Sequence, residues 1–322
     1  AIALAAAGRP EGPALLERLG PSGHAAARDL AGSGRHAPSA ATPARRRLAQ
    51  QARSVLASVP AAPARSTSLA VLGPLAVTWA GPGARDGDGT HLRLARRRVQ
   101  EVLAFLVAHR RTTRSAIETA LWPELDPRAA ANNLSVTLNH LRRVLEPERD
   151  PREPSYLLRL SGPGVALFTD DLGLRIDVDE FDEHLRAAAR AEIDGTPSVA
   201  LDHDLAAVEL YRGDLHAELV DVDWLALDRE HYRTGLVAAA VRAGELLLGR
   251  GEPDHAEAVA RRALEVDAWS EGPYGVLVNA ALARGDRAAA QRHLDRCAKA
   301  VAALGLGLSA SVEQLQRRIH GA

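Results

Sequence analysis

The clearest pattern in the chain is a helical spacing of leucines between residues 127 and 145. The leucines of this stripe are Leu134, Leu138, Leu141 and Leu145. Their intervals of three and four residues place them on one face of a helix. Asp126 followed by Pro127 predicts where the helix starts, because aspartate accepts the first free amides and proline loses nothing at the first helical position. The pattern therefore predicts a helix over 127–145 whose leucine face packs against a core.

The opposite face of this predicted helix carries a different set of side chains. Its members are Ala129, Asn132, Val136, Asn139, His140 and Arg143. Amide, imidazole and guanidinium groups beside an apolar residue are the types that read base edges in a major groove. No acid occurs between Arg128 and Arg143. On this stretch alone, an ordinary amphipathic helix with a polar outer face is the alternative interpretation.

Shorter patterns on both sides of this helix complete a small domain. The predicted elements are strands at 69–79 and 91–94, helices at 95–109 and 114–122, and a hairpin at 156–168. Gly73–Pro74 interrupts the first strand, and Thr113 is a suitable cap for the second helix. A strand pair, three helices and a terminal hairpin follow the order of a winged helix-turn-helix domain.

The second half of the chain is predicted to be helical and contains an internal repeat. The segment 251–264 aligns with 285–298 at an offset of 34 residues, which is the tetratricopeptide period. The alignment places Gly251 over Gly285, where glycine makes the turn between paired helices. Cys297 falls at a position where a small residue lets two helices approach, so we expect it to pack rather than react.

Charge is divided unevenly along the chain. Residues 93–114 contain seven arginines and one acid, Glu101, whereas residues 170–232 contain 18 acids and five arginines. The start of a predicted helix carries three consecutive arginines, Arg96, Arg97 and Arg98. Cations at this end of a helix interact unfavourably with its dipole. Contact with phosphate is one interaction that would offset this cost. One half of the chain suits a phosphate backbone and the other is repelled by it.

Several protein classes are disfavoured by what the sequence lacks. It has one cysteine, no apolar run of about 18 residues and no secretory signal, so we expect a cytoplasmic protein without a membrane span. It has no phosphate-binding loop and no metal-ligand motif, so we expect no catalytic activity, no cofactor and no metal. The acidic groups at 202–204 and 221–223 are interpreted as helix caps and a solvated face. Because the sequence contains no methionine, we expect the C-terminal part of a longer protein.

Residues 69–168 resemble the OmpR-type winged-helix domain of the Streptomyces antibiotic regulatory protein (SARP) group. The resemblance rests on VLGPLAV, the basic first helix, ALWP at 120–123 and NNLSVTLNHLRRVLEP. It implies that 132–143 enters a major groove, that Arg114 and Trp122 lie near phosphate, and that the hairpin at 156–168 approaches the minor groove. A tryptophan at a helix end is equally consistent with core packing, so that alternative for Trp122 stays open. Where the family often has arginines on the reading face, this chain has asparagines and His140, so the family's sequence preference does not transfer.

Residues 176–319 resemble the bacterial transcriptional activation domain (BTAD) that follows the winged helix in the same group. The resemblance rests on DVDEF, LYRGDL, the Asp223–Trp224 pair, RGEPDHAEAVARRALEVD and ALGLGLSASVEQL. LGLGLSAS departs from the family's usual stretch, and Ala268 replaces the proline that often closes a tetratricopeptide repeat. The resemblance implies dimerisation on direct repeats and contact with RNA polymerase holoenzyme.

These observations predict a mainly α chain with a small β component. We expect a helical or disordered leader and linker at 1–66, a winged-helix DNA-binding domain at 67–170, and an all-α tetratricopeptide-like BTAD at 171–322. The expected function is sequence-specific transcriptional regulation, as an activator that binds double-stranded DNA. The alternatives are a protein-interaction scaffold and the output module of a larger ATPase switch.

The residues expected to contact DNA fall into two groups. Arg96, Arg97, Arg114 and Arg159 are the expected phosphate contacts, together with Trp122 as implied by the resemblance. The residues expected to face the bases are Asn132, Asn133, Val136, Asn139, His140 and Arg143. Asparagine favours adenine, so we expect at least one A·T pair in the bound site.

Overall fold

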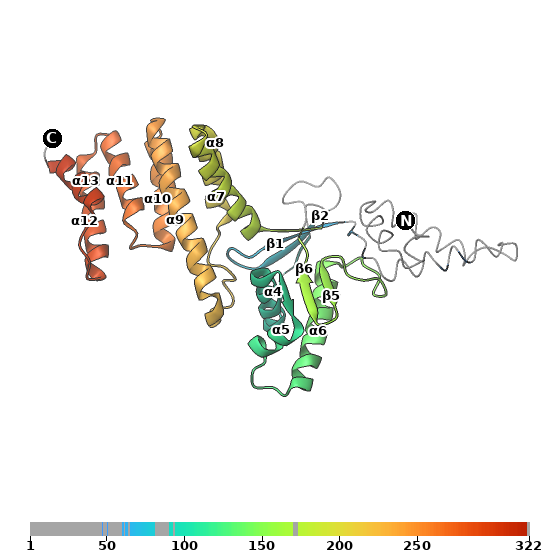
Figure 1. The fold of residues 1–322 in the computed structure, drawn as a ribbon. Helices are drawn as coiled ribbons and strands as arrows, with labels where there is room; N and C mark the ends of the chain where they lie inside the picture. Colours follow the sequence, from blue (N-terminus) through green and yellow to red (C-terminus); the bar gives the residue numbers. More distant parts are fainter. Residues whose placement is uncertain are drawn as a thin grey trace. The chain divides into compact units, whose positions relative to one another are not determined.

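The structure, a computed structural model, describes residues 65–80, 90–92, 94–169 and 173–320, together with the isolated positions 47, 50, 60, 62 and 63 (Figure 1). The chain separates into two units. Unit 1 is Ala1–Leu69 with Ala76–Ile176, and unit 2 is Ala70–Leu75 with Asp177–Ala322. The predicted leader at 1–66 lies almost wholly outside the described residues, and the glycine-rich segment 81–89 lies wholly outside them.

A four-stranded sheet in unit 1 has the order β3-β2-β1-β7. Its strands are β1 (Ser66–Ala70), β2 (Ala76–Ala80), β3 (Thr90–Leu92) and β7 (Leu174–Ile176). β2 and β3 are antiparallel, with Val77 opposite Leu92, as the predicted hairpin requires. β7 runs parallel to β1, with Thr67 opposite Leu174. No sequence pattern predicted β7, because three residues are too few to show an alternation.

The three helices of unit 1 are α4 (Arg97–His109), α5 (Arg114–Leu121) and α6 (Pro127–Leu145). A second sheet in unit 1 has the order β4-β6-β5. Its strands are β4 (Arg111–Thr113), β5 (Leu158–Ser161) and β6 (Gly164–Leu167). Gly162 turns the β5–β6 hairpin with a φ of 55°, a conformation that glycine adopts without strain. Three helices and a terminal hairpin make unit 1 a winged helix, and α6 has the bounds that the sequence predicted.

Unit 2 is a succession of helices, as predicted for a helical-repeat domain. They are α7 (Asp177–Ile193), α8 (Pro197–Leu210), the short 3-10 helix η1 (Asp223–Leu225), α9 (Ala226–Gly249), α10 (Pro253–Val266), α11 (Glu271–Ala283), α12 (Arg287–Ala303) and α13 (Ala310–His320). From α7 to α13 each helix packs against the next. None of the helices in the described ranges has both the length and the apolar composition that a bilayer crossing requires.

The internal repeat has the register that the sequence predicted. Gly251 and Gly285 both have a left-handed backbone, with φ of 77° and 76°, in the turns that precede α10 and α12. Ala263 and Cys297, which the alignment superimposes, are both fully buried. Burial also raises the pKa of the Cys297 thiol to about 11, so the thiol stays protonated and inert. The predicted packing role of Cys297 is therefore confirmed.

The segment Ala70–Leu75 belongs to unit 2, although it lies between two strands of unit 1 in the sequence. The buried carboxylate of Asp177 accepts hydrogen bonds from the backbone amides of Val71 and Leu72 at 2.8–2.9 Å, and from Arg212 at 3.0 Å. Burial raises the pKa of Asp177, and these three donors act in the opposite direction. The Asp177 carboxylate thus anchors this segment to the start of α7.

Close helix packing in unit 2 depends on Gly244. A Cβ added at this position would lie 2.6 Å from Cγ1 of Val276 on α11. We expect Gly244→Ala to lower the free energy of unfolding by about 1–3 kcal/mol, because α9 and α11 must move apart. Gly249→Ala, in the same helix, meets no atom within 4 Å and should leave stability unchanged or slightly raised. Urea denaturation of both variants checks this, and equal losses would contradict it.

Candidate nucleic-acid interface

The helix α6 is fixed by packing along its length and by hydrogen bonds at both ends. Its leucine face is sealed: Leu134, Leu138, Leu141 and Leu145 are each at most 1% exposed. At its start, the carboxylate of Asp126 accepts from the amides of Arg128 and Ala129 at 3.0 and 3.1 Å. At its end, the side chains of Trp79 and Thr67 donate to the carbonyls of Val144 and Leu145, each at 2.9 Å. These donors satisfy carbonyls that a helix end leaves free.

The opposite face of α6 is open to solvent among the described residues. The exposed members of the predicted reading face are Asn132, Asn133, Val136, Asn139 and Arg143, whereas Ala129 and His140 are half-buried. Val136, the apolar member of this face, is 64% exposed. The exposed side chains include both amide and guanidinium donors, and no acid occurs between Arg128 and Arg143.

Arg114 lies beside this face and is held there by two hydrogen bonds. Its guanidinium donates to the hydroxyl of Ser135 on α6 at 2.6 Å, and that hydroxyl donates to the carbonyl of Ala131 at 2.8 Å. Its backbone amide donates to the carbonyl of Pro163 in the β5–β6 turn at 2.9 Å. Arg114 therefore links α5, α6 and the β5–β6 hairpin. It also brings a positive charge next to the exposed face. No sequence pattern predicted the contact between Arg114 and Ser135.

Two of the three arginines at the start of α4 form ion pairs with an acid of the same helix. Glu101, only 5% exposed, accepts from Arg97 at 2.9 Å and from Arg98 at 2.6 Å. Phosphate is one partner that the sequence predicts for these arginines, and Glu101 is a second partner that the prediction did not include. The i, i+3 and i, i+4 spacing to Glu101 was the signal that could have revealed it. Arg96, which precedes the helix, is exposed.

Trp122 and Arg159 both contact aromatic or guanidinium partners within unit 1. Trp122 is 8% exposed and Arg98 lies 5.8 Å from its ring centroid, which favours the packing alternative. The guanidinium of Arg159 lies 3.9 Å from the centroid of Phe168 and 5.1 Å from that of Tyr156. It is thus stacked on aromatic rings at the base of the hairpin. The stacking partners come from both flanks of the hairpin and were not evident from the sequence.

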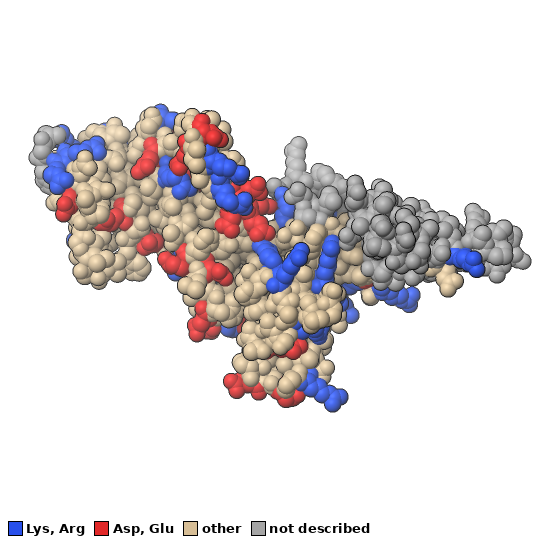
Figure 2. Space-filling model, in the orientation of Figure 1, with Lys and Arg blue, Asp and Glu red and all other residues tan. Residues whose placement is uncertain are grey.

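The two halves of the chain differ in charge. Residues 94–169 contain 12 arginines and 8 acids, a net charge of +4, whereas residues 176–320 contain 16 basic and 26 acidic residues, a net charge of −10. Figure 2 shows basic side chains gathered over the part of unit 1 that contains the β5–β6 hairpin, and acidic side chains interspersed with basic ones over the helices of unit 2. Unit 1 is the part suited to a polyanion.

In the acidic group at 202–204, Asp202 is exposed, as expected for a solvated face, whereas Asp204 serves packing. Asp204 is fully buried and pairs with Arg242 on α9, with oxygen to nitrogen distances of 2.5 and 3.2 Å. His203 contacts His184 on α7, with 2.9 Å between their Nδ1 atoms. Within the described ranges, no group of three or more histidine, cysteine, aspartate or glutamate side chains is arranged to hold a metal ion.

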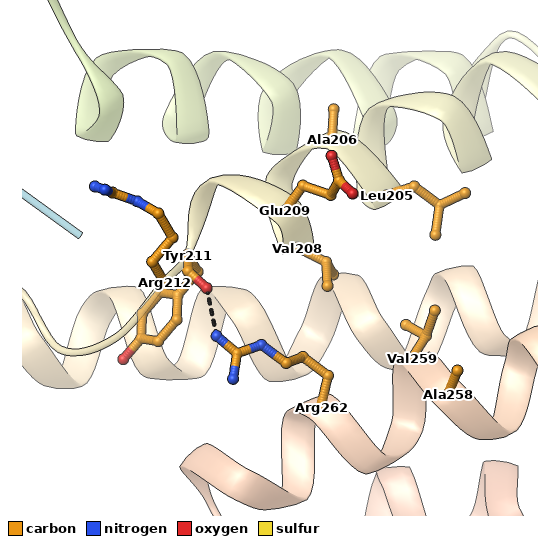
Figure 3. A pocket seen from close by; sticks show the side chains of 9 residues that line it. All are labelled: Leu205, Ala206, Val208, Glu209, Tyr211, Arg212, Ala258, Val259 and Arg262. Atoms are coloured by element: carbon orange, nitrogen blue, oxygen red, sulfur yellow. Dashed lines mark hydrogen bonds between the residues drawn. The ribbon is translucent and has the colours of Figure 1, made fainter. Parts of the chain in front are cut away.

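An apolar groove of about 540 Å³ lies between α8 and α10 in unit 2 (Figure 3). Leu205, Val208 and Val259 form its walls. Arg262 crosses one end, where it donates to the backbone carbonyl of Tyr211 at 2.8 Å. The groove offers apolar surface and a few charged side chains at its edge, without a pair of groups arranged for acid-base chemistry.

The architecture is that of a winged helix joined to a helical-repeat unit. Residues 176–320 match the family described as bacterial transcriptional activator domain. Among solved structures, the chain is similar to Mycobacterium tuberculosis EmbR, which was determined in complex with a low affinity phosphopeptide. The TM-score is 0.65 at 24% sequence identity, and the match covers 80% of this chain and 65% of the EmbR chain. This likeness establishes the fold. No curated protein sequence gives a significant match to the chain.

The two faces of α6 should respond differently to truncation. Leu138→Ala is expected to lower the free energy of unfolding by about 2–5 kcal/mol, because it opens a cavity in a sealed core. Val136→Ala removes a side chain that is 64% exposed, so its effect should stay within about 0.5 kcal/mol. Thermal and urea denaturation of both variants measure this difference. A large loss from Val136→Ala would show that the exposed face is packed in solution.

Proposed function

We propose that this protein is a sequence-specific DNA-binding transcriptional regulator, and that it acts as an activator. The observation that carries the proposal is the acid-free, exposed face of α6 opposite a fully buried leucine face. An α-helix with this construction fits a major groove, with Asn132, Asn139 and Arg143 turned towards base edges. The proposal also gives Asn133, Val136 and His140 positions at the DNA surface.

Phosphate contacts would set the position of α6 in the groove. Arg96 and Arg114 are the proposed contacts, since one is exposed and the other lies beside the helix. Arg97 and Arg159 would contribute less than free arginines, because Glu101 and the rings of Tyr156 and Phe168 already engage them. The β5–β6 hairpin would approach the neighbouring minor groove, as the family resemblance implies.

Unit 2 would bind protein rather than DNA, because its net charge of −10 is repelled by phosphate. The match of residues 176–320 to the bacterial transcriptional activator domain supports this role. RNA polymerase holoenzyme is the proposed partner, and dimerisation on direct repeats is a further part of the proposal. The proposed location of the protein is the cytoplasm.

Salt should weaken DNA binding steeply. If about five phosphates are contacted, log affinity should fall with log salt concentration at a slope near −4.5, because each contact releases condensed counterions. Fluorescence anisotropy with a promoter fragment over a range of salt concentrations measures this slope. A flat response would contradict phosphate-dominated binding.

Asn139 should carry sequence discrimination. Asn139→Ala is expected to lose about 1–3 kcal/mol of preference for a selected site over a variant changed at one base pair. Random DNA should lose much less affinity, because phosphate contacts persist. Asn279→Ala, on α11, is the matched control and should bind both DNAs as the unaltered chain does. Equal weakening on selected and random DNA would mean that Asn139 only positions the helix.

A protein-interaction scaffold is a second candidate, favoured by the apolar groove between α8 and α10. Electrophoretic mobility on genomic fragments distinguishes the two functions. A scaffold shifts no fragment, whereas the proposed regulator shifts a subset of them.

A further inference from the structure

The segment 218–230 of unit 2 combines exposed apolar side chains with acids. Val220 is 74% exposed and Leu227 is 85% exposed, and these residues flank the short helix η1. A single exposed aliphatic residue is common on protein surfaces, but two such residues in one short segment mark a candidate contact surface. We call residues 218–230 the acidic turn.

The acidic turn is held by hydrogen bonds from its own Arg229 and by buried apolar side chains. The guanidinium of Arg229 donates to the carbonyls of Leu215, His216, Leu219 and Val220, at distances from 2.6 to 3.5 Å. Leu219, Val222 and Leu225 alternate with the exposed residues and are at most 7% exposed. Val220 and Leu227 are therefore presented on a preorganised support, which reduces the entropy lost on binding.

The charge around these two residues indicates the kind of partner. Asp221, Asp223 and Glu230 are exposed, and Asp228 is half-buried. The one arginine of the segment, Arg229, is occupied by the four carbonyls. A surface with this composition repels nucleic acid and attracts a basic protein surface that offers an apolar recess.

We propose that the acidic turn is the docking site of unit 2 for a basic protein surface, with Val220 and Leu227 entering apolar recesses of the partner. Asp221, Asp223, Asp228 and Glu230 steer the encounter and lie opposite the partner's basic side chains. The assignment of that partner to RNA polymerase holoenzyme rests on the proposed function.

The test uses the full chain, purified RNA polymerase holoenzyme and two DNA-independent binding assays, surface plasmon resonance and analytical ultracentrifugation. Val220→Ala combined with Leu227→Ala should weaken holoenzyme binding about tenfold or more, because exposed apolar anchors dominate such interfaces. Asp221→Asn combined with Asp223→Asn should slow association and reduce its salt dependence. Affinity for promoter DNA should be the same in both variants and the unaltered chain.

Ile193→Ala is the matched control. Ile193 is also 85% exposed and lies between two acids, Glu192 and Asp194. Glu192 lies 3.6 Å from Arg242, which is 15 residues further along α9 than Leu227, about 22 Å at 1.5 Å per residue. This control should bind holoenzyme as the unaltered chain does, which separates the acidic turn from acidic apolar surface in general.

Three results would overturn the proposal. They are unchanged holoenzyme binding by the Val220→Ala and Leu227→Ala double variant, an equal loss from Ile193→Ala, and no holoenzyme binding by the unaltered chain. If the third result came with a self-association that the double variant abolishes, the occupant would be a second copy of this chain. Loss of DNA binding alone, with the holoenzyme results as expected, would count against the proposed DNA function and support the acidic turn.

Discussion

The packing of the α6 leucine face is the interaction on which the rest of unit 1 depends. Four leucines that are at most 1% exposed hold the helix, and each contributes roughly 1.5–3 kcal/mol through burial. A rotation by one residue, about 100°, would carry Asn139 towards the core and expose a leucine. The Asp126 cap and the hydrogen bonds from Thr67 and Trp79 fix both ends of the helix. The exposed face is thus set by the core, and its orientation does not depend on a ligand.

Contacts within the protein decide which charges are available to a partner. Glu101 engages Arg97 and Arg98, and aromatic rings engage Arg159, whereas Arg114 is held at the edge of the exposed face by Ser135. A count of arginines therefore overstates the phosphate-binding capacity of unit 1. The contrast between +4 in residues 94–169 and −10 in residues 176–320 persists, because it depends on the sum of charges. Such a contrast makes the approach of a polyanion to the acidic unit unfavourable.

Much of this fold is predictable from the sequence because the deciding signals are local. The leucine spacing and the Asp126–Pro127 start define α6, and the 34-residue offset defines the register of α10 and α12. Contacts between distant segments were not predictable, because no periodicity encodes them. The parallel pairing of β7 with β1, the anchoring of Val71 by Asp177, and the stacking of Arg159 on Phe168 are of this kind. Most of the exposed face of α6 was predictable from helical spacing, except that Ala129 and His140 are half-buried. The internal partners of the arginines mostly were not predictable.

The central claim is that α6 reads adenine in a major groove through its asparagines. The most direct measurement replaces the adenines of a selected binding site with 7-deazaadenine, which removes the major-groove acceptor N7 and leaves the minor groove unchanged. The account predicts weaker binding by the unaltered chain, by about 1–3 kcal/mol for each adenine that is read, and little further loss in Asn139→Ala at the adenine that Asn139 contacts. Unchanged affinity for the substituted DNA would contradict the claim.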